Sequence, residues 1–218
     1  TKLLREQGMQ TRGIVEANDA NTTLAFVHIA EGGDRSFSFY RKNCADILLQ
    51  ESEIDYTLID ASCFFHFGSV SMTEEPARSA TFAAAAYAKK AGKMVSFDPN
   101  YRPNLWTQPE HAREAILRGL QYADIVKVSE EELEFLTGDG DLQDAGQKLC
   151  REYGLSILLV TMGKSGACCI TKEFSVYQPT FDVKTVDTNG AGDASMGGFL
   201  FCLMDRQIDP ERITRQQA

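Results

Sequence analysis

Residues 156–161 read Ser-Ile-Leu-Leu-Val-Thr, a short apolar run typical of a strand that is buried on both faces. A stretch with helical signals, residues 141–153, comes directly before it. The same alternation extends back along the chain, with apolar runs at 125–128, 94–97 and 63–67 and helical stretches at 109–120 and 75–90. Strands that alternate with helices of ten or more residues predict βαβ units. The sequence therefore predicts an α/β fold, with a mostly parallel central sheet flanked by helices.

Local signals indicate where the later elements begin and end. Ser129 and Glu132 have the spacing of a capping box, which predicts a short helix ending at residues 137–138. Residues 166–170 and 174–177 are typical of a hairpin. A last helix is expected to begin at residue 190 or 191 and to run to about residue 204.

The first part of the chain does not follow this rhythm. Residues 21–29 are apolar and β-branched, residues 31–34 suit a turn, and residues 36–41 alternate small polar with aromatic side chains. We expect these residues to form a separate small sheet, a β lid contributed by about residues 13–41, on a single α/β domain that spans residues 1–218. A β face left exposed by such a lid is a candidate surface for a homodimer.

Composition and charge exclude several classes of protein. The chain has 31 acidic and 22 basic residues and a net charge of -9, so its surface should repel a nucleic-acid backbone. No apolar run reaches the roughly 18 residues of a membrane span. The first residues lack both an initiator methionine and the apolar segment of a secretory signal. We expect a cytoplasmic protein that binds neither nucleic acid nor membrane, in a chain that lacks N- and C-terminal parts.

Cysteine and histidine spacing agrees with that expectation. The six cysteines form no C-x-x-C pair, and we expect buried free thiols in a reducing compartment. The three histidines have no Cys or His partner at ligand spacing, which argues against a structural zinc site.

Polar clusters follow several of the predicted strands. In an open α/β sheet, ligands bind beyond the carboxyl ends of the strands, so these clusters should converge on one edge. They are residues 68–69, 98–102, 127–129, 161–164 and 187–193.

The last cluster carries the clearest chemistry. Gly190-Ala191-Gly192 precedes a helix, where exposed backbone N–H groups suit a phosphate. Asp193 would then be an anionic acceptor beside that phosphate, as phosphoryl transfer to a hydroxyl requires. A glycine-rich helix start with a favourable first-turn charge would have the same sequence. The residues alone leave both interpretations open.

Four segments, in order, resemble the ribokinase-like (pfkB) family of carbohydrate kinases, and within it the fructokinases. Residues 186–194, Val-Asp-Thr-Asn-Gly-Ala-Gly-Asp-Ala, are similar to the family's second signature. Residues 96–106 resemble a D-P-N-x-R-x-x-L-W segment, residues 127–138 an N-x-x-E segment with its trailing L-T-G, and residues 160–167 the strand and turn beside the nucleotide. The resemblance extends over about residues 13–203 and implies a ribokinase-like fold.

The resemblance implies a role for each matching residue in the transfer from ATP. Asp193 would accept the proton of the sugar hydroxyl, and the amides of Gly190, Ala191 and Gly192 would neutralise the moving phosphoryl group. Glu132 would hold Mg²⁺ through water, and Asp187 would bind a monovalent cation such as K⁺. The residues expected to bind the nucleotide are Lys127, Ser129, Thr161, Gly163 and Gly166.

Five residues are candidates for the sugar side of the site. Arg102 follows a strand end directly, and its guanidinium can hold a phosphate or a carboxylate. The others are Tyr40, Arg41, Asp98 and Asn100, of which Asp98 and Asn100 also suit a turn. Ser129 stands where the family motif has Asn. The family's first strand and sugar-binding Asp, and its closing elements over the adenine, have no counterpart in this sequence.

The resemblance implies an ATP-dependent sugar kinase, and a fructokinase that makes fructose 6-phosphate before any other. A 2-keto-3-deoxygluconate kinase is the alternative, in which Arg102 or Arg41 would pair with the carboxylate. A nucleotide-binding module without catalysis is a third possibility. The expected partners are a small-molecule sugar and ATP.

Overall fold

The computed structural model describes residues 1–29, 35–183 and 188–218 of the chain. Its main feature is a six-stranded sheet in the order β3-β4-β5-β6-β7-β8. The strands β3 to β6 are parallel, and β7 and β8 are antiparallel additions that form the predicted hairpin. Their bounds are Phe64–Gly68, Met94–Asp98, Ile125–Ser129, Ile157–Thr161, Ala167–Ile170 and Ser175–Gln178.

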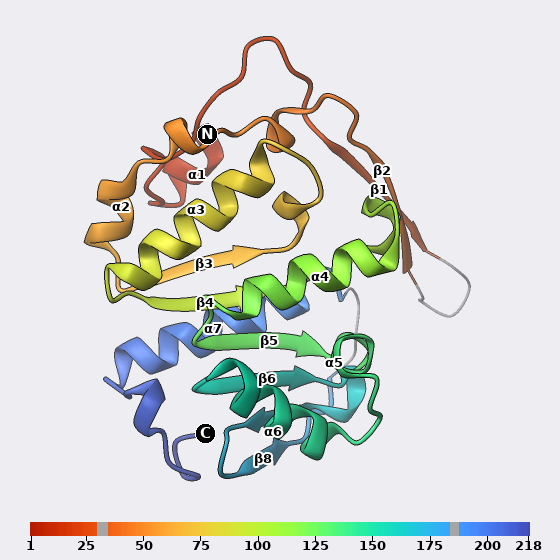
Figure 1. Cartoon of the computed structure of the whole chain (residues 1–218), viewed down its shortest axis with the longest axis vertical. Helices are drawn as coiled ribbons and strands as arrows, with labels where there is room; N and C mark the ends of the chain where they lie inside the picture. The colour runs from red at the N-terminus through yellow and green to blue at the C-terminus, as the bar shows by residue number, and fades with distance from the viewer. Residues whose placement is uncertain (30–34, 184–187) are drawn as a thin grey trace.

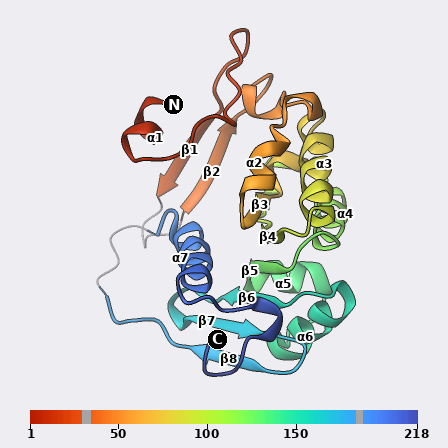
Figure 2. The same ribbon diagram turned by 90° about the vertical axis from the view of Figure 1, so that its left-hand side faces the viewer.

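Helices cover both faces of this sheet. Four lie on one face, and a single long helix, α7 (Ala191–Asp205), lies on the other (Figures 1 and 2). The four are α3 (Ala77–Lys90), α4 (Pro109–Leu120), α5 (Glu130–Thr137) and α6 (Leu142–Tyr153). Two shorter helices, α1 (Lys2–Glu6) and α2 (Tyr56–Ala61), and six 3₁₀ turns complete the described helical elements. The expected ribokinase-like architecture, a mostly parallel sheet between helices, is confirmed.

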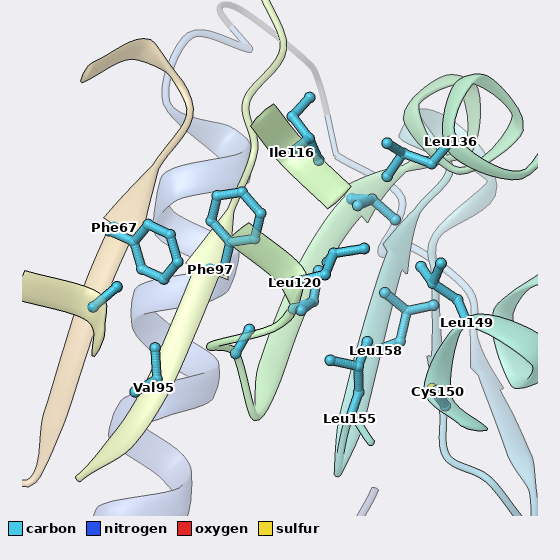
Figure 3. Close-up of a cluster of buried hydrophobic side chains, with 14 of the residues drawn as sticks. Phe67, Val95, Phe97, Ile116, Leu120, Leu136, Leu149, Cys150, Leu155 and Leu158 are labelled. Atoms are coloured by element: carbon cyan, nitrogen blue, oxygen red, sulfur yellow. The ribbon is translucent and has the colours of Figure 1, made fainter. Parts of the chain in front are cut away.

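The larger core lies between the sheet and the four helices. Phe97 of β4 stacks on Phe67 of β3 with ring centroids 4.5 Å apart, and both rings are buried (Figure 3). Each such ring contributes about 1.5–3 kcal/mol relative to an exposed one. Leu120 of α4 and Leu158 of β6 continue the cluster. The smaller core joins α7 to the opposite face through Met196 and Leu203.

A small antiparallel sheet, β1 (Leu24–Ile29) and β2 (Arg35–Tyr40), stands beside the start of α7 (Figure 2). It lies on the side to which β3 and β5 point (Figure 1). Because side chains alternate along a strand, Phe37 and Phe39 share one face of β2 while Tyr40 belongs to the other. The two phenylalanine rings are half-buried, whereas Tyr40 is 58% exposed.

Most of the predicted elements are confirmed, and one is reproduced to the residue: the helix over 109–120. The expectation of buried cysteines is wrong for two of the six. Cys63 stands just before the outermost strand β3, and Cys202 lies on α7 next to the buried Leu203 but is itself exposed, although all six thiols are free. Among the described residues, no helix combines the length and apolar character needed to cross a bilayer.

Candidate active site

The carboxyl ends of the strands, the start of α7 and the small sheet meet around one cavity of about 220 Å³. The predicted residues Asp193, Gly190, Gly192, Arg102 and Asn100 all line it, together with Lys127. Its remaining lining residues are Phe37, Thr188 and Asn189. The structure therefore brings together residues that are up to 156 positions apart, from Phe37 to Asp193.

The start of α7 forms one wall of the cavity. Gly190 caps the helix in the left-handed region, with φ of 74°, and the N–H of Ala194 donates to its carbonyl at 2.8 Å. The first N–H groups of a helix have no intrahelical acceptor, so the amides of Gly192 and Asp193 are available to an anion, whereas that of Ala191 donates to the carbonyl of Thr188 at 3.1 Å. Asp193 lies in this first turn and lines the cavity. The free amides of the helix start and a carboxylate are thus adjacent.

The ends of β4 and β5 form the opposite wall. Lys127 Nζ donates to Asp98 Oδ2 at 2.8 Å, and the two side chains are only 8% and 5% exposed. The other oxygen of Asp98 accepts the backbone N–H of Asn100 at 3.1 Å. Asn100 itself has φ of 48°, an uncommon conformation for a residue with a side chain. Each oxygen of Asp98 thus has a partner within the protein and Asp98 does not line the cavity, while Asn100 faces the cavity from a tight turn.

Glu132 joins this wall to the next helix. Its Oε2 accepts the N–H of Ser129 at 2.8 Å, its Oε1 accepts the N–H of Tyr101, and Ser129 Oγ accepts the N–H of Glu132. The predicted capping box is present, which gives Ser129 a structural reason to replace the family's Asn. Burial raises the pKa of Glu132 above its usual value, although both backbone hydrogen bonds act in the opposite direction.

The small sheet closes over Arg102. The guanidinium of Arg102 lies 5.4 Å from the centre of the Phe37 ring, a cation–π contact. Asn104 Nδ2, two residues further on, donates to the Phe37 carbonyl at 2.9 Å. These contacts hold β2 against the segment that follows β4.

Two of the predicted sugar-side residues lie elsewhere. Tyr40 is on the other face of β2 from Phe37 and does not line the cavity. The guanidinium of Arg41 is buried and donates to Asp46 at 2.6 Å, to Thr73 and to a main-chain carbonyl, so it anchors the base of the small sheet. Asp187 lies outside the described residues.

Three of the five residues predicted to bind the nucleotide, Thr161, Gly163 and Gly166, lie at and after the end of β6. Thr161 pairs with Ser129 of β5 in the sheet register, and neither lines the cavity around Asp193. Gly163 and Gly166 follow in the turn to β7, both with positive φ. A Cβ on Gly166 would lie 2.1 Å from the carbonyl oxygen of Gln178, so the close approach of β8 by itself requires glycine there.

Sequence reasoning missed three residues of the cavity: Phe37, Thr188 and Asn189. The alternation of residues 36–41 separates Phe37 and Phe39 from Tyr40, but it does not say which face turns inward. Thr188 and Asn189 stand within the glycine-rich signature, and the residues around an anion site could have been included on that ground.

A resident metal cage is not formed by the part of the chain that the structure describes: no group of three or more His, Cys, Asp or Glu side chains is arranged to hold an ion. Mg²⁺ in kinase sites is bound by substrate phosphates, several waters and one or two carboxylates. Glu132 fits that lesser requirement, because each of its oxygens keeps a lone pair beyond its backbone hydrogen bond.

The fold and the site define an α/β protein with a polar cavity at the start of a helix, beneath a small β sheet. A family model described as pfkB family carbohydrate kinase matches residues 1–214. The chain belongs to that family, as the four sequence segments predicted.

Known relatives of this chain include fructokinases. It is 43% identical over 205 residues to the probable fructokinase-2 of Arabidopsis thaliana, with 94% of this chain and 62% of that protein covered. A fructokinase of Vibrio cholerae O395, solved with fructose, ADP and a calcium ion bound, is 34% identical with a TM-score of 0.82, over 93% of this chain and 65% of that one. A fructokinase of Xylella fastidiosa with bound ATP is 36% identical with a TM-score of 0.85, over 94% and 63%. This chain thus spans about six-tenths of the length of its curated relatives.

Proposed function

We propose that the protein to which this chain belongs is an ATP-dependent fructokinase, which converts D-fructose to D-fructose 6-phosphate. The observation that carries the proposal is the position of Asp193, in the first turn of α7 and in one cavity with the cationic side chains of Arg102 and Lys127. The fructokinase relatives support fructose as the acceptor. The ATP-bound Xylella structure supports ATP as the donor.

In the proposed reaction, Asp193 accepts the proton of the sugar hydroxyl. The hydroxyl oxygen bonds to the γ-phosphorus of ATP as the bond from that phosphorus to the bridging oxygen breaks, and the electron pair leaves with ADP. The amides of Gly190 and Gly192 stabilise the charge on the phosphoryl oxygens, whereas that of Ala191, which was expected to do the same, already donates to Thr188. Arg102 adds positive charge from the opposite wall.

The remaining predicted residues have supporting roles in this proposal. Glu132 would hold a Mg²⁺ ion through water, and the ion would offset phosphate charge. Lys127, Ser129, Thr161, Gly163 and Gly166 belong to the nucleotide side, where Thr161 ends β6 and the two glycines follow it. Asp187 remains the candidate for a monovalent cation such as K⁺.

We also propose that the small sheet is a lid on a single domain formed by residues 1–218. The contact between Phe37 and Arg102 supports closure over the cavity, which keeps water from hydrolysing ATP. The outward face of the lid carries the exposed Leu24, Phe26 and Tyr40, an apolar surface suited to a homodimer. Six free cysteines fit a reducing compartment, so we place the protein in the cytoplasm.

A 2-keto-3-deoxygluconate kinase is the second candidate. Arg102 in the cavity favours it as well, because a guanidinium binds a carboxylate as readily as a phosphate. Arg41 does not support it, because its guanidinium is already bound by Asp46 and Thr73.

The experiment is a coupled ADP-release assay on the whole protein, including any sequence that flanks residues 1–218. The acceptors are fructose, 2-keto-3-deoxygluconate, ribose and adenosine, with Asp193→Asn as the control for background hydrolysis. We expect the highest kcat/KM with fructose. A higher kcat/KM with 2-keto-3-deoxygluconate would identify the keto acid, and not fructose, as the acceptor. ATP binding without turnover of any acceptor would support a nucleotide-binding module instead.

A further inference from the structure

Another cavity, of about 290 Å³, lies between helices α3 and α4, on the face of the sheet opposite α7. It shares no lining residue with the cavity around Asp193. Two arginines and a histidine line it, in a chain whose net charge is -9. Its lining residues are Arg78, Phe82, His111, Glu114, Ala115 and Arg118.

The guanidinium of Arg118 is fixed by an aromatic ring. Its central carbon lies 4.0 Å from the centre of the Phe82 ring, and that ring is buried. A guanidinium stacked on a ring uses its face for the contact, so its five N–H donors, which lie in its plane, stay available. Within the described part of the chain, Arg118 makes no hydrogen bond or ion pair through these donors.

The guanidinium of Arg78 is fixed from the other helix. Its Nε donates to the carbonyl of Met72 at 2.6 Å, and its Nη2 donates to the carbonyl of Thr73 at 2.7 Å. Three of its five N–H groups remain for other acceptors. Both arginines are thus held in place without a ligand, which reduces the entropy that a ligand would have to overcome on binding.

The charges around the cavity are not balanced by the protein. Two guanidinium groups that line one small cavity repel each other. Glu114 is the only acid in the lining, and among the residues described it forms no ion pair with either arginine. The Nδ1 of His111 is 3.0 Å from Thr107 Oγ1, which leaves Nε2 for a further contact. An anion between the two helices would offset the repulsion.

We infer that this cavity binds the phosphate group of a small molecule, free inorganic phosphate or a sugar phosphate, between Arg78 and Arg118. Phosphate oxygens point in four directions and can accept from donors on both helices, whereas a carboxylate matches one guanidinium. The volume is close to the lower end of ligand pockets, about 300 Å³, and suits a small molecule. The inference goes beyond the proposed kinase function and does not depend on it.

A purely structural role for these arginines predicts a different outcome. Arg118 would then only cover the Phe82 ring, and Arg78 would only connect α3 to the carbonyls before it. Replacing Arg118 would lower the free energy of unfolding but would leave the affinity for phosphate unchanged. The two interpretations therefore differ in a binding constant that can be measured without turnover.

The test is titration calorimetry of the whole protein with inorganic phosphate, at fixed ionic strength because salt screens exposed charges. Arg118→Met keeps an apolar chain over Phe82 without donors, and Arg118→Lys, which keeps the charge, is a milder second variant. Lys90→Met is the control, because Lys90 is an exposed cation of α3 outside the cavity. Arg102→Met detects phosphate that binds at the candidate active site instead.

We expect Arg118→Met to bind phosphate about tenfold or more weakly, since hydrogen bonds to a charged group are lost, and Arg118→Lys to show a smaller loss. Lys90→Met and Arg102→Met should retain this binding. No phosphate binding by the unaltered protein, an unchanged affinity in both Arg118 variants, or a loss confined to Arg102→Met would overturn the inference.

A parallel titration with fructose 6-phosphate distinguishes the two sources of the phosphate group. Tighter binding than that of inorganic phosphate, lost in Arg118→Met, would assign the cavity to a sugar phosphate. Equal or weaker binding, lost in the same variant, would assign it to free phosphate.

Discussion

Replacing Glu132 with glutamine tests the hydrogen bonds that connect helix α5 to the candidate site. The carboxylate accepts two backbone N–H groups, those of Ser129 and Tyr101, with one oxygen each. Glutamine offers a single carbonyl oxygen, so one of these N–H groups must face an NH₂ group instead. A partly buried donor left without an acceptor costs about 1–3 kcal/mol. We therefore expect the free energy of unfolding to fall by about that amount.

The pH dependence of this loss has a defined sign. Burial raises the pKa of Glu132, so between its usual value of 4.5 and the raised value the folded protein binds a proton that the unfolded chain does not. The folded state of the unaltered protein therefore gains stability from this group as the pH falls through that window. The glutamine variant has no such gain, and its deficit should be larger at pH 5 than at pH 7.

Urea unfolding in EDTA, followed by the fluorescence of Trp106, the sole tryptophan, measures both effects without metal. Glu131→Gln is the matched control, and the pH dependence of its loss of stability should have the opposite sign. A hydrogen bond from Ser129 lowers the pKa of Glu131, so the stability that this carboxylate adds is lost as the pH falls below about 4.5, and the deficit of its variant shrinks there. A deficit of Glu132→Gln that is absent, or that shrinks between pH 7 and pH 5, would refute the reasoning. In the active protein the same change should also weaken the response of turnover to Mg²⁺.

Three further outcomes follow from the geometry. Arg102→Lys keeps the charge but loses the two-pronged guanidinium, so kcat/KM from steady-state kinetics should fall by the equivalent of about 1–3 kcal/mol. The fall should be mainly in kcat if the acceptor is fructose, and mainly a raised KM if the acceptor is a keto acid. Phe37→Ala removes the ring that contacts Arg102, so the ratio of ADP released to sugar phosphate formed should rise. Phe26→Ala, on the outer face of the small sheet, should leave that ratio unchanged. Gly146→Ala in α6 places a Cβ 2.5 Å from the facing isoleucine of β7. The resulting overpacking, about 1–3 kcal/mol, should exceed the gain in helix propensity of roughly 1 kcal/mol, so the free energy of unfolding should fall. Gly197→Ala in α7 has open space around it, so its free energy of unfolding should rise.

Local chemistry explains which parts of the fold were predictable. The helix over 109–120 begins with proline at its first position, and the capping box of Ser129 and Glu132 marks the next helix, because these signals act within a few residues. The buried strand 157–161 is nearly all apolar and could be placed from composition. Short helices such as Tyr56–Ala61 have no long periodic pattern, and they were missed.

The candidate site was predictable where one segment supplies it and not where distant segments meet. Gly190, Gly192 and Asp193 form a continuous motif, and they line the cavity as expected. Arg41 follows a strand that borders the site, but its partners Asp46 and Thr73 come from elsewhere in the chain and turn it away. The pairing of Lys127 with Asp98 depends on which strands are neighbours, and a sequence pattern does not contain that information.

The most direct test of the central claim is the turnover of Asp193→Asn in the whole protein, with fructose and ATP, measured by coupled ADP release alongside ATP affinity by calorimetry. The amide keeps the shape of the carboxylate but cannot accept the hydroxyl proton, and a general base contributes about 10²- to 10⁴-fold to the rate. The account predicts a fall in kcat within that range, with ATP affinity nearly unchanged because the helix amides remain. A fall of less than about tenfold would contradict the role of Asp193 as the base.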